Sequence, residues 1–291
     1  MIQGLAAGLG AAALWGSVFV VSKAVLPVVP PFTLLVMRLV LGGIALAVVG
    51  LWRNQRRESG GRWTPKAWAG LLGAGFVGYG VSLAMQFVGT SMGTAGEASL
   101  ITCTTPVFVA ILAGPVLGEH VGPRQFYSLG LAVLGVLAVL GPGLGNPGAG
   151  SLVADLLLVG AGITWAFYTV GTARAGRGLD LTLASLAGFL GGLPVALAGS
   201  AWELSSHPVG TLTPGIVAGI LFLGLVTTAG AMVLWNYAFR VLPASTAALT
   251  FFAQPVVGTL LGALFLGETP GILFFAGAAL IAAALVTGRK S

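Results

Sequence analysis

Residues 104–119 read TTPVFVAILAGPVLGE, and 149 residues further on, residues 253–268 read AQPVVGTLLGALFLGE. Both stretches are long and apolar, and each has a proline at its third position, Pro106 in the first and Pro255 in the second. Both finish on Leu-Gly-Glu. A match that runs through a whole apolar segment, including its proline and its final Leu-Gly-Glu, indicates that the chain repeats a structural unit.

The same spacing relates the rest of the two halves. Further matches are Gly42-Gly43 with Gly191-Gly192, Gly75 with Gly224 and, after a slip of one residue, Trp15 with Trp165. Each half holds five apolar segments, and an odd number makes the second half enter a bilayer from the opposite side to the first. We therefore expect an all-α membrane protein of ten transmembrane helices, built from two inverted five-helix repeats over residues 1–145 and 150–291.

Composition agrees with a chain embedded in lipid. Of the 291 residues, 57% are hydrophobic and 7% are charged, and the mean hydropathy is +1.02. Because a helix needs about 20 apolar residues to cross a bilayer, the expected spans can be placed along the chain. They are 3–22, 32–52, 67–88, 94–117, 124–141, 152–173, 181–201, 215–238, 244–266 and 271–287. The first segment lacks a basic leading region, so we interpret it as a span and not as a signal peptide.

The basic residues predict the orientation of these spans. With the N-terminus inside, the inner loops and tail hold Arg53, Arg56, Arg57, Arg62, Lys66, Arg124, Arg174, Arg177, Arg240, Arg289 and Lys290. Lys and Arg flanking short loops stay on the cytoplasmic side, so both termini are expected in the cytoplasm. The formal charge of +6 is then a topology signal, and no nucleic-acid partner is expected.

Cysteine and histidine offer little chemistry. Cys103 is the only cysteine, which excludes an internal disulfide and a cysteine-based metal site. His120 and His207 fall in loops on opposite sides of the membrane, so we expect no metal and no cofactor. Glu119 and Glu268 each precede a helix, and we expect them to cap the positive end of that helix.

Polar and aromatic residues inside the spans are the candidates for substrate binding, because a polar group that faces lipid is costly. Tyr79, Ser82 and Gln86 follow the i, i+3, i+7 spacing of one helix face. The full set of substrate-binding candidates is Trp15, Tyr79, Ser82, Gln86, Trp165, Tyr168, Trp235 and Gln254. The competing interpretation of such stripes is hydrogen bonding and ring packing between helices.

Three charged residues break the pattern and are candidates for charge-based or coupling roles: Lys23, Arg38 and Glu97. Arg38 lies roughly 9 Å into its helix, where a charge costs about 2.5 to 3.5 kcal/mol. Glu97 enters its own helix at a similar depth, so a structural pair with Arg38 is the favoured interpretation. The alternatives are a substrate carboxylate bound by Lys23 or Arg38, and a proton carried by Glu97.

Pro106 and Pro255 lie inside the expected fourth and ninth spans, where proline removes a backbone hydrogen bond and disturbs the carbonyl four residues earlier. Because they occupy matched positions in the two repeats, we interpret them as hinges that also shape a cavity.

The run WGSVFVVSK at 15–23, followed by Arg38 and by the stretch from Pro106 to Glu119, resembles the EamA-type branch of the drug/metabolite transporter superfamily. As a whole the chain looks most like the YddG-type exporters of aromatic and other neutral amino acids. This resemblance covers nearly the whole chain. It implies a basket-shaped bundle with a central hydrophobic cavity, in a bacterial inner membrane, that moves small metabolites outward.

The sequence therefore predicts a carrier that exports small amphipathic metabolites, with aromatic or neutral amino acids as the favoured class, by alternating access. A drug or nucleotide-sugar carrier of the same superfamily is the alternative. An intramembrane enzyme is disfavoured, because the metalloprotease motif H-E-x-x-H does not occur in the sequence. The expected partners are a small-molecule substrate and the lipid bilayer, with protons as a candidate coupling ion.

Overall fold

The computed structural model describes residues 2–54, 63–118, 122–144, 151–176, 179–242 and 250–287. Every regular element in these residues is a helix, which agrees with the expected all-α chain. The expectations for Glu119, for His120 and for most of the basic loop between 53 and 66 concern residues outside the described part. The expected boundary between the repeats, at 145–150, also lies outside it and stays a prediction.

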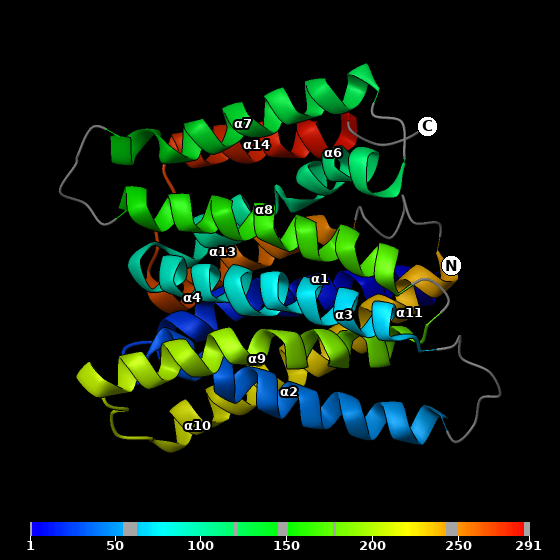
Figure 1. Ribbon diagram of the computed structural model, residues 1–291. Helices are drawn as coiled ribbons and strands as arrows, with labels where there is room; N and C mark the ends of the chain where they lie inside the picture. The colour runs from blue at the N-terminus through cyan, green and yellow to red at the C-terminus, as the bar shows by residue number, and fades with distance from the viewer. Residues whose placement is uncertain are drawn as a thin grey trace.

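The first half holds α1 (Ile2–Val25), α2 (Pro31–Asn54), α3 (Pro65–Gly75), η1 (Phe76–Ser82), α4 (Leu83–Met92), α5 (Ala95–Thr102), α6 (Thr105–Leu117) and α7 (Pro123–Leu144). The second half holds α8 (Ser151–Ala175), α9 (Leu181–Ser206), α10 (Pro214–Leu221), η2 (Phe222–Gly230), α11 (Ala231–Val241), η3 (Thr250–Phe252), α13 (Ala253–Leu266) and α14 (Ile272–Thr287). The helices lie side by side in one bundle (Figure 1). We call the end where α1 begins and α14 finishes the terminal end, and the other the distal end.

The helices are long and apolar enough for a multi-pass membrane protein. Six runs qualify as spans by length and hydropathy: Ile2–Val25, Pro31–Gly50, Pro65–Met92, Leu152–Ala175, Thr182–Ser206 and Pro214–Trp235. Shorter apolar helices cover Phe126–Gly135, Ala253–Leu266 and Ile272–Ala284. Six expected spans thus have a matching helix of full length, and the count of ten stays a prediction.

The two halves pack by exchanging equivalent helices. Helix α1 packs against α11 and α13 of the second half, while its counterpart α8 packs against α4 and α6 of the first. In the same way α2 contacts η2, α9 contacts η1, and α7 pairs with α14. The repeat also extends to the backbone, since Gly118 and Gly267 occupy matched positions with φ values of 73° and 66°. Side chains other than glycine rarely adopt that conformation.

The largest buried cluster of apolar side chains lies between α1, α2, α4, α9 and the two η segments. Its large side chains that are at most 2% exposed include Leu34, Leu35, Leu39, Phe87, Phe189 and Leu223. This core holds α2 in place beside α4 and η2, and so fixes the position of Arg38 on α2.

The segments η1 and η2 are π-helices, and they overlap under the repeat spacing. A π-helix closes its hydrogen bonds over five residues, one more than an α-helix, and is frequent at functional sites. The extra residue per turn rotates the side chains that precede it away from the face expected for an α-helix.

The expected fourth span, 94–117, is broken at Cys103 and Thr104, so Pro106 lies in the first turn of α6 and not in the middle of a helix. The carbonyl four residues before it, that of Thr102, accepts a 2.7 Å hydrogen bond from the Thr105 hydroxyl. Pro255 likewise lies in the first turn of α13, after the short η3 turn. The expected kinks are therefore helix starts, and at Pro106 the Thr105 hydroxyl bonds to the carbonyl that proline leaves without an N–H donor.

Candidate functional site

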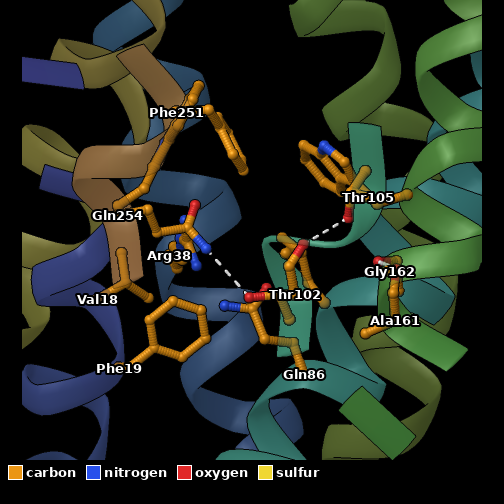
Figure 2. A pocket seen from close by; sticks show the side chains of 14 residues that line it. Val18, Phe19, Arg38, Gln86, Thr102, Thr105, Ala161, Gly162, Phe251 and Gln254 are labelled. Atoms are coloured by element: carbon orange, nitrogen blue, oxygen red, sulfur yellow. Dashed lines mark hydrogen bonds between the residues drawn. The ribbon is translucent and has the colours of Figure 1, made fainter. Parts of the chain in front are cut away.

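A cavity of about 80 Å³ lies inside the bundle. It is lined by Trp15, Val18, Phe19, Arg38, Ser82, Leu83, Gln86, Thr102, Thr105, Ala161, Gly162, Trp165, Phe251 and Gln254. Figure 2 shows the labelled side chains of this set pointing into a common space. Both repeats supply the walls, so the cavity lies where the two halves meet.

Amide and hydroxyl groups form the polar part of the cavity. Gln254 is buried, and its Nε2 donates to the Thr102 hydroxyl at 3.1 Å and to the Ser99 carbonyl at 3.3 Å. The Ser82 hydroxyl donates to the Ala161 carbonyl at 2.7 Å. The amide of Gln86 and Oε1 of Gln254 have no hydrogen-bond partner among the described residues, so both are free to bind a ligand.

Two tryptophans give the cavity its aromatic walls, and each is backed by further rings. Trp15 packs on Trp235 with 5.0 Å between ring centroids, and on Phe251 at 5.7 Å. Trp165 packs on Tyr79 at 5.4 Å and on Tyr168 at 4.8 Å. These contacts fix the indole planes, so each presents a rigid apolar surface to the cavity.

The structure brings five of the eight expected substrate-binding residues to the cavity: Trp15, Ser82, Gln86, Trp165 and Gln254. The other three, Tyr79, Tyr168 and Trp235, lie behind the tryptophans and do not line it. Tyr79 and Ser82 would share a face in an α-helix, but both belong to the π-helix η1, whose wider turn separates the directions of their side chains.

Tyr168 is held in the core by its hydroxyl, which donates to the Tyr79 hydroxyl at 3.1 Å. The apolar lining residues Val18, Phe19, Leu83 and Phe251 had no polar signal that could single them out in a chain this hydrophobic.

Arg38 contributes a positive charge to this cavity. The residue is 5% exposed, and its Nε donates to the Thr228 hydroxyl at 2.7 Å. The guanidinium carbon lies 5.6 Å from the ring centre of Phe87. Its Nη1 is buried and has no hydrogen-bond partner among the described residues.

The expected pair between Arg38 and Glu97 is not formed. Glu97 belongs to a capping box at the start of α5, where its Oε2 accepts from the Thr94 hydroxyl at 2.8 Å and from the Thr94 N–H at 3.3 Å. Arg38 and Glu97 lie at a similar depth along their helices, but their side chains point to different neighbours. Asp155, a second acid in this part of the bundle, has a buried Oδ1 without a partner among the described residues.

Lys23 and Glu268 join helices at the distal end instead of facing the cavity. Lys23 Nζ donates to the carbonyls of Thr90, Ser91 and Gly93, at the C-terminal end of α4. Glu268 accepts from the N–H groups of Ala95 at 2.6 Å and Gly96 at 2.9 Å, so it caps α5. Glu268 was expected to cap the helix that follows it in sequence, and this expectation is wrong. The helix that it caps, α5, belongs to the other repeat.

Comparisons with known proteins agree with this architecture. The model of the EamA-like transporter family matches residues 2–141 and 152–287. A protein named "Uncharacterized transporter" from Archaeoglobus fulgidus is 29% identical over 263 residues, covering 88% of this chain and 87% of its own. "Uncharacterized transporter YoaV" from Bacillus subtilis is 25% identical over 271 residues, covering 92% and 90%.

Two further matches are a relative whose name includes a substrate class and a chain of known structure. A protein of Streptantibioticus cattleyicolor named "Probable terminal-alkyne amino-acid exporter" is 28% identical over 203 residues, which is 68% of this chain and 65% of its own. A solved chain described as "Crystal structure of protein" matches 98% of this chain and 95% of its own with a TM-score of 0.67 and 20% identity. At that identity the likeness concerns the fold alone.

Proposed function

The chain belongs to the EamA-like transporter family, and from that premise we propose that it exports small amphipathic metabolites, namely aromatic or other neutral amino acids, by alternating access. The family and the names of its relatives make it a membrane transporter and not an enzyme. The proposal concerns what it carries, in which direction and how.

The observation that carries the proposal is the composition of the cavity wall. The indoles of Trp15 and Trp165 suit an apolar or aromatic side chain, while the free amide groups of Gln86 and Gln254 suit the polar end of the same molecule. The relative named as an amino-acid exporter supports this substrate class.

The position of the cavity supports alternating access. Carriers built from inverted repeats bind substrate where the repeats meet, beside interrupted helices. Here both interruptions, at 103–104 and at η3, lie directly before the helix starts that hold Pro106 and Pro255. We assign these two segments as the hinges, with both termini cytoplasmic in a bacterial inner membrane and the distal end outside. Protons are the candidate coupling ion.

The proposal is tested by transport in proteoliposomes that hold the purified protein. Efflux of radiolabelled L-phenylalanine, L-leucine and L-glutamate is measured with and without a pH gradient, together with a cationic dye as a drug probe. We expect saturable movement of phenylalanine and leucine and little movement of glutamate. Movement of the dye without any amino acid would overturn the amino-acid proposal in favour of a drug carrier.

A matched pair of variants links transport to the cavity. Trp165→Ala removes a cavity wall and should raise the KM for phenylalanine, whereas Trp202→Ala changes a side chain that is 74% exposed and should leave the KM unchanged. Thermal unfolding of both variants separates loss of binding from loss of folded protein, because Trp165 also packs on Tyr79 and Tyr168.

A further inference from the structure

We propose that Arg38 is the binding site for a carboxylate on the transported molecule, which restricts the substrates to compounds with a carboxylate beside an apolar group. This inference rests on the proposed function and names the chemical class that the same cavity takes.

The first step of the argument is a buried charge without a counter-ion. A guanidinium stays protonated in proteins, and a charge within a membrane span is costly unless a partner compensates it. In the described part of the chain, no carboxylate forms an ion pair with Arg38, and its hydrogen-bonded partner is the neutral hydroxyl of Thr228. A site that is built to keep a charge unpaired is typical of a ligand site.

The second step is that the guanidinium is held in one orientation. The Thr228 hydroxyl donates its own proton to the Leu223 carbonyl at 2.8 Å, so its oxygen is left to accept from Nε of Arg38. Phe87 covers the guanidinium at 5.6 Å. The Thr228 bond occupies Nε, and the Phe87 ring covers part of the guanidinium plane. Nη1 has no hydrogen-bond partner among the described residues, and the Arg38 side chain lines the cavity.

The third step is the chemistry of the other groups that line the cavity with Arg38. The lining contains no Asp or Glu that would repel an anion. Oε1 of Gln254 and the amide of Gln86 can accept hydrogen bonds from an ammonium, while Trp15 and Trp165 offer surface to an apolar side chain. A planar guanidinium matches the geometry of a carboxylate, so the set suits a zwitterion with an apolar side chain.

The experiment compares three probes by isothermal titration of the full chain in detergent. L-Phenylalanine carries both charges, phenylalaninamide lacks the carboxylate, and 3-phenylpropionate lacks the ammonium. We expect the parent protein to bind the two carboxylates about 10- to 100-fold more tightly than phenylalaninamide, the range for a hydrogen bond to a charged group.

Variants assign that difference to Arg38. Arg38→Met should weaken binding of both carboxylates by about 10- to 100-fold and leave phenylalaninamide unchanged. Lys23→Met is the matched control, because Lys23 is also a cation in an apolar helix, α1, but contacts α4 carbonyls, and it should leave all three affinities unchanged. Thr228→Val keeps the charge and removes its anchor, so it should weaken the carboxylates by a smaller factor.

Equal binding of L-phenylalanine and phenylalaninamide by the parent protein would overturn the proposal, and so would unchanged affinity in folded Arg38→Met. If Arg38→Met does not fold, the affinities of the three probes for the parent protein and for Thr228→Val still decide whether Arg38 binds the carboxylate. Transport of amino acids with no preference for a carboxylate would sink this inference and leave the proposed function standing. Arg38-dependent binding of 3-phenylpropionate without any amino-acid transport would support the carboxylate site and overturn the proposed function.

Discussion

Gly16 lies where α1 crosses α13, and replacing it with alanine should destabilise the protein. A Cβ atom at Gly16 would lie 2.4 Å from the Gln254 carbonyl oxygen and 3.1 Å from the Gly258 nitrogen. These are backbone atoms of α13, which cannot rotate aside as a side chain can. The two helices would have to separate by about 1 Å before the contact became an ordinary one.

Overpacking of this kind costs about 1 to 3 kcal/mol, and the higher helix propensity of alanine returns at most about 1 kcal/mol. The expected net loss for Gly16→Ala is therefore about 1 to 2 kcal/mol. Gly10→Ala is the matched control on the same helix, because its Cβ would meet only a Leu234 methyl at 3.6 Å. The control should be neutral or more stable than the parent by up to about 1 kcal/mol.

The assay is unfolding of the purified protein in detergent, by denaturant titration and by heating, with all three proteins in the same buffer. The free energy of unfolding of Gly16→Ala should be lower than that of the parent protein, and that of Gly10→Ala should not. Equal stability of the two variants would refute the close crossing of α1 and α13, and with it the position of Gln254 in the cavity wall.

Three further outcomes follow from the contacts described. Glu268→Ala should lose about 2 to 4 kcal/mol of unfolding free energy, because two N–H groups of α5 lose a charged acceptor, and Glu268→Gln should lose less; equal losses would show that the charge is not used. Tyr79→Phe removes the acceptor for the Tyr168 hydroxyl and should cost about 1 kcal/mol without changing the KM for substrate, whereas a raised KM would place Tyr79 in the cavity. In intact cells a cysteine at Thr211 should react with an impermeant thiol reagent and one at Lys66 should not, while the native Cys103 is buried and silent; labelling at Lys66 would reverse the predicted topology.

The repeat could be predicted from the sequence because it depends on spacing alone. Matches such as Leu-Gly-Glu at 117–119 and 266–268 survive any error in where a helix begins. The cavity residues Trp15, Gln86, Trp165 and Gln254 could be found for a related reason, since polar or aromatic groups that recur inside apolar helices must face something other than lipid.

The errors share a different cause. Assigning Tyr79 to the cavity assumed 3.6 residues per turn, and the π-helix at 76–82 has no signature that we could read from composition. Pairing Arg38 with Glu97 used depth along each helix, which says nothing about the direction around it. Glu268 caps a helix of the other repeat and not its neighbour in sequence, because a cap can come from any chain segment that reaches the helix end.

The position that matches Arg38 in the second repeat is Ala187, which is buried beside Leu71 and away from the cavity. Both repeats supply walls of the cavity, but among the residues that line it Arg38 alone carries a charge. The site that we propose at Arg38 therefore offers one anchoring charge for each protein molecule. We accordingly expect one carboxylate to bind per chain, although the helices that surround the site belong to two similar repeats.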